Sequence, residues 1–248
     1  MIRLLATLAL LCAPLAAQAE IVLVAVAANY AAAAEDIATA FASATGHQAQ
    51  ITTGSSGKLH AQISQGAPFA ILLAADTKTP AALEDEGLAV PGSRFTYAIG
   101  GLTLYSADPA LIGPDPLSAL TAARFIAIAN PDLAPYGLAA QQALTALGQW
   151  DAVQPKIVMG QNIGQVFAMA EAGAADAAFV ATSALTGRSG GSRWDVPQDL
   201  FTPIRQDAVL LLPGQGNAAA LAFMEFLRTD IARALAKRQG YKTGDDPA

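Results

Sequence analysis

The 248-residue chain contains a single cysteine, Cys12, and two histidines, His47 and His60. Cys12 lies inside an expected N-terminal leader, so the mature chain should form no disulfide and offer no thiol nucleophile or thiolate metal site. The histidines are separated by thirteen positions, and no cluster of Asp or Glu accompanies them at the spacing of a metal centre. We therefore expect neither a cofactor nor a metal coordinated directly by side chains.

Charged residues are also scarce. Asp, Glu, Lys and Arg make up 14% of the chain, apolar residues make up 53%, and the formal net charge is −6. This balance suits one large or two modest globular domains, because a disordered chain needs few apolar residues and many charges. An acidic chain without a basic run is not expected to bind nucleic acid. Any anion would have to be held by local dipoles rather than by the overall charge.

Apolar runs long enough to cross a bilayer are missing as well. The first 19 residues are instead typical of a secretory signal peptide. Arg3 supplies the positive charge, residues 4–15 form a short apolar segment, and an A-x-A cleavage motif occupies residues 17–19. We expect cleavage after Ala19 and a soluble, exported chain that begins at Glu20.

The rest of the chain alternates between apolar extended segments and helical patterns. Strands that are apolar throughout and separated by helices predict an α/β fold with mainly parallel sheets and helices on both faces. Residues 187–191 predict a flexible loop. The expected strands are 21–26, 48–53, 69–74, 125–129, 156–159, 177–181 and 208–212, and the expected helices are 31–44, 59–64, 80–87, 138–146, 163–171, 218–228 and 231–239.

Residues 95–105 form an unusually long extended segment with a Gly-Gly pair in its middle. The pattern allows either a crossing between two lobes or an ordinary strand with a bulge. With a return through the last predicted strand, the chain would cross twice. We expect a signal peptide over 1–19, a first lobe over 20–98 plus 207–248, a second lobe over 99–206, and a hinge formed by the two crossings.

Small, amide and hydroxyl residues stand where four predicted strands lead into helices. The carboxyl ends of parallel strands are where such sheets bind ligands, and helix N-termini present free N–H groups that bind anions. Two of these junctions belong to each lobe, so we expect an anion in the cleft between the lobes. The junction residues are Ala28 and Asn29, Ser55 and Ser56, Tyr136, and Asn162 with Ile163.

Each of these residues also has a purely structural explanation. Asn29 and Ser56 could cap the helices that follow them, and Tyr136 could cover the edge of the core with its hydroxyl in water. Residues 54–58 do not match a nucleotide phosphate loop, because only two residues separate the glycines and no hydroxyl follows Lys58. A serine hydrolase built on Ser56 would need a base, and His60 has no obvious acidic residue to orient it.

Taken together, these motifs resemble the periplasmic molybdate-binding proteins, the ModA-like solute-binding components of ABC oxyanion importers. The similarity extends over nearly all of residues 20–245. The segments that carry it are AANY at 27–30, GSSGKL at 54–59, QGAPF at 65–69, LE and GL within 83–88, PGSRFTYAIG at 91–100, and NP with APYG within 130–137.

The resemblance implies a two-lobed periplasmic solute-binding fold (type II) that binds molybdate and tungstate by neutral hydrogen bonds, without catalysis and with molybdenum held as the oxyanion. It implies a monomer in the periplasm whose partners are the permease and ATPase subunits of an importer. Asn29 and Ser56 match the first-lobe contacts, and Tyr136 and the main-chain N–H of Ile163 match the second-lobe contacts. Ala28 and Ser55 are further candidates.

Four positions depart from the family pattern. Ala70 replaces a frequent Asp, which we expect to lie beside the cleft and to affect ligand identity, and Ala75, Gln161 and Ala181 replace Ser, Glu and Tyr. Sulfate, phosphate or an organic anion in the same fold is the nearest alternative. A serine hydrolase, or a degenerate relative acting as an adhesion or sensory partner, is a more distant one.

Overall fold

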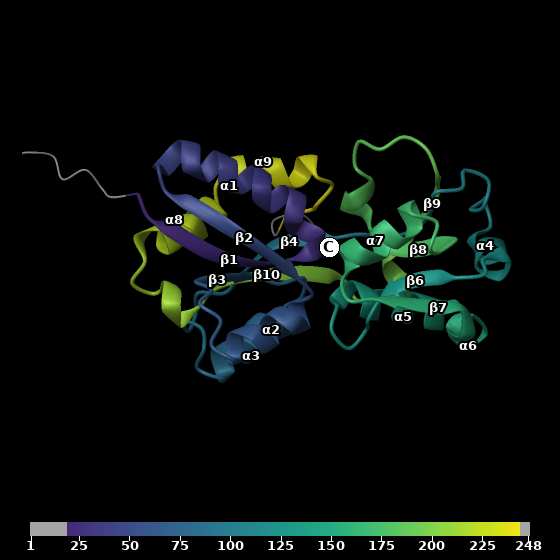
Figure 1. The fold of residues 1–248 in the computed structure, drawn as a ribbon, viewed down its shortest axis with the longest axis horizontal. Helices are drawn as coiled ribbons and strands as arrows, with labels where there is room; N and C mark the ends of the chain where they lie inside the picture. The colour runs from purple at the N-terminus through teal and green to yellow at the C-terminus, as the bar shows by residue number, and fades with distance from the viewer. Residues whose placement is uncertain (1–18, 244–248) are drawn as a thin grey trace, which may run out of the picture.

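The computed structural model describes residues 19–243 and contains two five-stranded sheets, each covered by helices (Figure 1). The expected leader lies outside the described residues apart from Ala19. Within residues 19–243, no helix is both long and apolar enough to cross a membrane. The α/β fold with helices on both faces of the sheets is confirmed, but the sheets are mixed rather than mainly parallel, because β10 (Ile204–Leu210) and β5 (Leu102–Ser106) run antiparallel to their neighbours.

The first sheet has the strand order β2-β1-β3-β10-β4. β1 pairs in parallel with β2 and β3, whereas β10 runs antiparallel to β3 and β4. α1, α8 and α9 lie on one face of this sheet and α2 and α3 on the other (Figure 1). The strands are β1 (Ile21–Ala27), β2 (Gln48–Gly54), β3 (Ile71–Leu73), β4 (Phe95–Gly100) and β10 (Ile204–Leu210), and the helices are η1 (Ala28–Tyr30), α1 (Ala31–Thr45), α2 (Ser56–Ser64), α3 (Lys78–Asp85), η5 (Leu212–Gly214), α8 (Ala218–Phe226) and α9 (Asp230–Arg238).

The second sheet repeats this plan with the order β7-β6-β8-β5-β9. β6 pairs in parallel with β7 and β8, and β5 runs antiparallel to β8 and β9. The strands are β5 (Leu102–Ser106), β6 (Ile126–Ala129), β7 (Ile157–Gly160), β8 (Ala177–Ala181) and β9 (Ser192–Asp195), and the helices are α4 (Pro116–Ala122), α5 (Pro135–Ala146), α6 (Trp150–Val153), η2 (Gln154–Lys156), α7 (Ile163–Glu171), η3 (Thr182–Leu185) and η4 (Gln198–Leu200).

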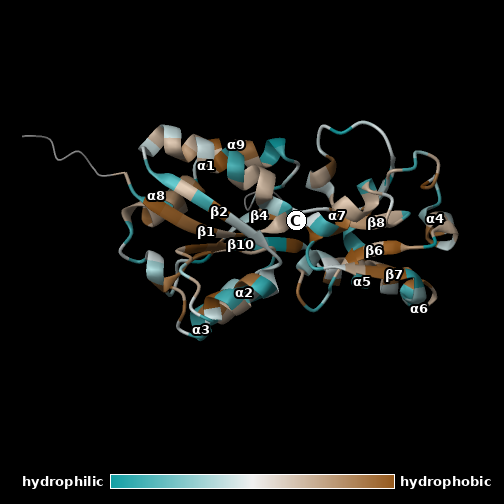
Figure 2. Cartoon of the chain, in the orientation of Figure 1, coloured by the Kyte–Doolittle hydropathy of each residue, from teal (hydrophilic) through white to brown (hydrophobic). Residues whose placement is uncertain are grey.

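Apolar strands account for the layered arrangement, because a strand that is hydrophobic on both faces needs a cover on each. Figure 2 shows hydrophobic residues along β1, β6 and β7 and hydrophilic residues on α2 and α3. Separate clusters of buried side chains fill the two faces of the first sheet, and a third cluster fills the second sheet. Each sheet therefore has its own core.

The long extended segment over residues 95–105 is divided between the two sheets. β4 ends at Gly100 and pairs with β10, whereas β5 starts at Leu102 and pairs with β8 and β9. A Cβ on Gly101, between them, would lie 2.7 Å from the Thr182 hydroxyl, so a side chain does not fit there. The chain passes back into the first sheet where β10 begins at Ile204. The division into lobes and the hinge stay a prediction.

Candidate functional site

The four strand-to-helix junctions meet at one small cavity of about 10 Å³. A cavity of this size is close to the minimum that admits one water molecule. All six residues predicted as ligand contacts line it, so the structure brings together residues that are far apart in the sequence. The lining residues are Ala27, Ala28, Asn29, Gly54, Ser55, Ser56, Ala75, Ala134, Pro135, Tyr136, Asn162 and Ile163.

The parallel pairings explain this convergence. β1 and β2 are neighbours in register from Ile21 to Ala27, so the residues that follow them emerge at the same edge of the first sheet. β6 and β7 do the same for the second sheet, where Pro135 begins α5 and Ile163 begins α7. Both edges face the same gap, and each junction contributes a helix N-terminus with free N–H groups.

Ser55 is the N-cap residue of α2, but its hydroxyl makes no capping hydrogen bond. The side chain is buried, at 4% relative exposure. Among residues 19–243, this hydroxyl is the one buried side-chain polar atom without a hydrogen-bond partner. Leaving a buried donor unsatisfied costs about 1–3 kcal/mol. The fold thus keeps an uncompensated hydroxyl at the cavity wall.

Ser56 is fixed by a different contact. Its hydroxyl oxygen accepts a hydrogen bond from the Ala75 N–H at 2.9 Å, which leaves its own proton to be donated. The neighbouring Asp76 carboxylate accepts from the Thr79 N–H at 2.6 Å and from the Thr79 hydroxyl at 3.1 Å. Burial raises the pKa of Asp76, while hydrogen bonds from Thr79 and Ser56 oppose that shift. The Ser56 proton can therefore be given to Asp76 or to a guest in the cavity.

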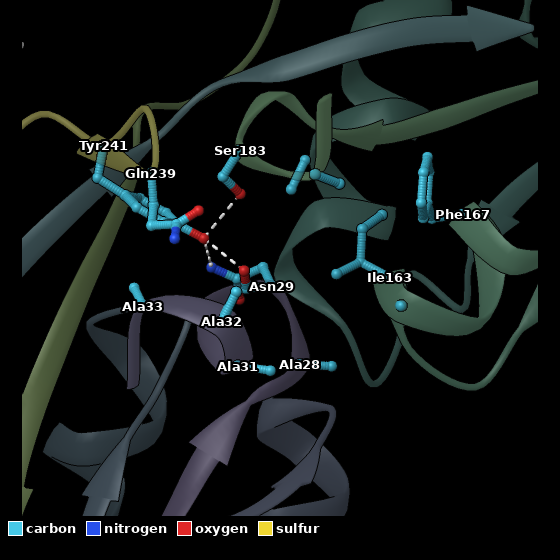
Figure 3. A pocket seen from close by; sticks show the side chains of 13 residues that line it. Ala28, Asn29, Ala31, Ala32, Ala33, Ile163, Phe167, Ser183, Gln239 and Tyr241 are labelled. Carbon is cyan, nitrogen blue, oxygen red and sulfur yellow. Dashed lines mark hydrogen bonds between the residues drawn. The ribbon is translucent and has the colours of Figure 1, made fainter. Parts of the chain in front are cut away.

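The side-chain amide of Asn29 is bound within the protein and is not free to contact a ligand. Its Nδ2 donates to Gln206 Oε1 at 2.8 Å and to the Tyr241 hydroxyl at 3.1 Å. The Tyr241 hydroxyl in turn donates to the Asn29 carbonyl at 2.5 Å and lies 2.8 Å from Ser183 Oγ (Figure 3). Both hydrogens of the amide are thus used within the protein. The main-chain N–H of Asn29, in the first turn after β1, is the donor that it can offer to a ligand.

Tyr136 is buried at 1% relative exposure, so the alternative in which its hydroxyl lies in water is wrong. Gln206 Nε2 lies 3.5 Å from the hydroxyl and donates to it. Burial raises the pKa of Tyr136 well above its usual value, so the phenol keeps its proton and remains a neutral donor. Ile163 contributes as the first residue of α7, whose N-cap Asn162 already accepts from Gln165 N at 3.0 Å.

A second cavity of about 220 Å³ adjoins the first and shares Ala28, Asn29 and Ile163 with it (Figure 3). Alanines from η1 and α1 form one wall, and Phe167 lies on the opposite side. Tyr241, Ser183 and Gln239 supply its polar groups.

Four residues at or near the site were not predicted from the sequence. Gln206 and Tyr241 bond to Asn29, Ser183 bonds to Tyr241, and Tyr97 donates to Gln206 Oε1 at 3.2 Å. Tyr97 lies in a segment that resembles the family, but no pattern marks it as part of the site. The other three have no sequence signal, because the contacts depend on packing between distant segments.

Two expectations need correction. His60 does have an acidic partner, because its Nε2 lies 3.0 Å from Glu86 Oε1, but His60 lines a different cavity from the one that Ser56 lines. Ala70 does not lie beside the cleft. It precedes β3 at the amino end of that strand, opposite to the junction edge, and packs beneath Gly214. Ala75 lines the small cavity and Ala181 the larger one.

The small cavity has no charged side chain among its described lining residues. No group of His, Cys, Asp or Glu within residues 19–243 is arranged to hold a metal ion. What the cavity offers is a set of N–H and O–H donors at helix N-termini, which suits a small anion.

The family model for bacterial extracellular solute-binding proteins matches residues 22–242. The molybdate-binding protein ModA of Rhodobacter capsulatus is 45% identical over 229 residues, which cover 92% of this chain and 91% of that protein. ModA of Azotobacter vinelandii is 46% identical over 232 residues, covering 91% of each. The solved Azotobacter vinelandii periplasmic molybdate-binding protein superposes with a TM-score of 0.86 at 40% identity, covering 90% of this chain and all of that one (100%). The sulfate-binding protein SubI of Mycobacterium tuberculosis shares the fold, with a TM-score of 0.71 at 17% identity over 92% of this chain and 88% of that one.

Proposed function

This chain belongs to the bacterial extracellular solute-binding proteins, and we propose that it binds molybdate in the periplasm and delivers it to an ABC importer. The similarity to ModA proteins along most of the chain supports molybdate as the ligand. The observation that carries the proposal is the buried, unpartnered Ser55 hydroxyl in a cavity where helix N-termini of both sheets meet. A tetrahedral dianion would satisfy that hydroxyl and the free N–H groups together.

The proposed contacts are all neutral donors. They are the hydroxyls of Ser55, Ser56 and Tyr136 and the main-chain N–H groups of Asn29 and Ile163, with Ala28 beside them. A hydrogen bond to a charged group contributes about 1.5–3 kcal/mol, so several of them can approach the ~12 kcal/mol of nanomolar binding after ordering costs. Fixed donors favour a fully ionised oxyanion over one that carries a proton and needs an acceptor.

Size would then separate the candidate ligands. Molybdate and tungstate are both tetrahedral dianions, and we propose that the site takes both. The cavity of about 10 Å³ must widen to admit any of these five-atom ions. Sulfate has the same charge and shape as molybdate but a smaller radius, so we propose that its oxygens would not reach every donor of a site that closes around the larger ions. The site residues and the ligand preference rest on geometry together with the resemblance to ModA proteins.

We further propose that the two lobes, 20–98 plus 207–248 and 99–206, close on the ligand about the two crossings. A ligand that contacts both lobes favours the closed state. The importer's permease and ATPase subunits would recognise that state of a monomeric, non-catalytic binding protein. The leader over 1–19 would direct it to the periplasm, with cleavage after Ala19.

Isothermal titration calorimetry of the mature protein with molybdate, tungstate and sulfate tests the proposal. We expect tight binding of molybdate and tungstate and at least 100-fold weaker binding of sulfate, corresponding to a difference of about 2.7 kcal/mol. Ser43→Ala, on the exposed face of α1, is a matched control for changes at Ser55 and Ser56. Equal affinity for sulfate, or no heat with molybdate, would overturn the assignment.

A further inference from the structure

Gln206 lies at the centre of the hydrogen bonds behind the small cavity. It occurs on β10 next to an irregularity in the pairing with β4, between Gln206 and Asp207. Its side chain is fully buried at 0% relative exposure. A buried amide must have partners for both its oxygen and its nitrogen, since an unsatisfied end is costly.

Both ends of this amide bind residues at the site. Gln206 Oε1 accepts from Asn29 Nδ2 at 2.8 Å and from the Tyr97 hydroxyl at 3.2 Å. Gln206 Nε2 donates to the Tyr136 hydroxyl at 3.5 Å. Asn29 follows β1 in the first sheet and Tyr136 is the second residue of α5, against the second sheet, so one side chain joins proposed ligand contacts from both.

The direction of these bonds decides what the contacts can offer to an anion. Because Gln206 donates to the Tyr136 oxygen, the phenol does not spend its own proton on Gln206 and can direct it into the cavity. Because Gln206 accepts from Asn29, one amide hydrogen of Asn29 is used there, and Tyr241 takes the other. The Asn29 amide is thereby fixed, and its main-chain N–H is held at the cavity wall.

Close packing holds this arrangement in place. A Cβ added to Gly100 on β4 would collide with the Tyr136 hydroxyl and would lie 2.8 Å from Gln206 Nε2. The glycine thus provides the space in which the phenol and the amide meet. Neither side chain can move toward β4 without losing that fit.

We propose that Gln206 is a positioning residue that sets the direction of the hydrogen-bond donors around the oxyanion. An amide has an acceptor end for Asn29 and a donor end for Tyr136, whereas a carboxylate has acceptors only and an apolar side chain has neither. This inference rests on the proposed function. It assigns to Gln206 the task of keeping the Tyr136 proton available to the ligand.

A double-mutant cycle tests this role. Molybdate affinity is measured by calorimetry for the wild type, Gln206→Met, Tyr136→Phe and the double variant. Gln65→Met, at the exposed residue that follows α2, is the control. We expect each single change at the site to weaken binding about tenfold, as for loss of one hydrogen bond to a charged group. The double variant should bind no more than about twofold worse than the weaker single variant, because both changes remove the same donor.

The outcomes separate the two proposals. A wild type that does not bind molybdate would overturn the proposed function. A wild type that binds, with losses that multiply in the double variant, or a Gln206→Met variant that binds like the wild type, would overturn the role of Gln206 alone. If Gln206→Met weakened binding only by disturbing the structure, its fold-loss of affinity would multiply with that of Tyr136→Phe in the double variant.

Gln206→Glu keeps the test decisive if the apolar variant does not fold. Burial raises the pKa of a carboxyl to values as high as about 8–9. The introduced carboxyl would be protonated near pH 6, where it can both donate and accept, and largely ionised by pH 9, where it would accept the Tyr136 O–H as a hydrogen bond and so draw that donor away from the ligand. We expect affinity at least tenfold weaker at the higher pH, with little change in the wild type or in Gln65→Glu. An affinity equal to the wild type at both pH values would contradict the role.

Discussion

The backbone N–H of Gly57 donates to the carbonyl oxygen of Leu133 at 2.9 Å. This bond joins the first turn of α2, which follows the first sheet, to the loop between β6 and α5 of the second sheet. A Cβ on Gly57 would lie 3.1 Å from both the Cα and the carbonyl oxygen of Leu133. Segments that follow the two different sheets therefore meet closely where residue 57 has no side chain, directly beside Ser55 and Ser56.

Replacing Gly57 tests whether this approach is needed for binding. Gly57→Ala should hold the loop away from α2 and weaken molybdate binding about fivefold, the equivalent of one ordinary hydrogen bond. Calorimetry gives the affinity, and small-angle scattering with ligand should show a slightly larger radius of gyration. Gly113→Ala is the control, because a Cβ there meets nothing within 4 Å. Wild-type affinity in the Gly57 variant would show that the contact does not limit closure.

The two serines of α2 should respond differently to truncation. Ser55→Ala removes a buried hydroxyl that has no partner in the protein, so the free energy of unfolding of the unliganded protein should stay equal or rise. Molybdate affinity should nevertheless fall about tenfold. Denaturant unfolding and calorimetry on one preparation measure both quantities. A less stable protein with unchanged affinity would mean that Ser55 has a structural role only.

Ser56→Ala should lower both quantities. It removes the acceptor of the buried Ala75 N–H, and an unsatisfied buried donor costs about 1–3 kcal/mol of unfolding free energy. It also removes a proposed ligand donor, so affinity should fall as well. Denaturant unfolding and calorimetry again measure stability and affinity, and Ser55→Ala serves as the comparison. A variant as stable as the wild type would contradict the importance of the bond to Ala75.

Much of the fold was predictable because it depends on local patterns. α7 and β8 have the expected bounds, since an apolar helical pattern follows Asn162 and an apolar strand follows Asp176. β9 and the antiparallel pairings of β5 and β10 were not predicted. β9 is a short edge strand of mostly polar residues, Ser192–Asp195, and its pairing with β5 depends on contacts between distant segments.

The site was likewise predictable only where it depends on local patterns. The junction residues could be found because each follows an apolar strand and precedes a helix. Gln206 could not, because it precedes the apolar run that predicted a strand from residue 208. Tyr241 lies near the C-terminal end of the described residues, where an isolated bridge between Ile99 and Lys242 holds the segment beside β4. No periodic pattern marks such a contact.

Alkaline pH should destabilise the fold. Burial raises the pKa of all five tyrosines in the folded protein, including that of Tyr241 to about 12. The phenols of the unfolded chain ionise near pH 10, so the stabilisation is complete below about pH 10 and is lost as the pH rises through about 12. Denaturant unfolding across this range, followed by phenolate absorbance, measures the effect.

The loss of unfolding free energy at alkaline pH should be smaller in Tyr241→Phe, which removes one of the phenols whose pKa is raised. That variant should also be less stable near neutral pH, because the Asn29 carbonyl loses the hydroxyl that donates to it. Phenolate absorbance that appears near pH 10 while the protein is still folded would contradict the shifts.

The ion pair at the base of β4 should matter for stability. Arg94 Nη1 lies 3.1 Å from Asp207 Oδ2, and the Asp207 side chain is 5% exposed. Arg94→Met should lower the free energy of unfolding by about 1–3 kcal/mol, because it leaves a buried carboxylate with only the Thr96 hydroxyl as a donor nearby. It also removes the 3.3 Å contact between Arg94 Nε and Glu84 Oε2, and the partial exposure of Arg94 keeps the effect below that of a fully buried pair. Arg124→Met, at the exposed pair with Asp176, is the control and should have little effect. Equal effects of the two changes would contradict this account.

The uncharged lining of the small cavity also governs how a ligand arrives. The chain carries a formal charge of −6, so a dianion is repelled at long range and attracted only within reach of the N–H and O–H dipoles. Dissolved salt screens that repulsion beyond about 10 Å and would speed the encounter instead of slowing it. Tight binding of a dianion must then come from slow dissociation rather than from fast association.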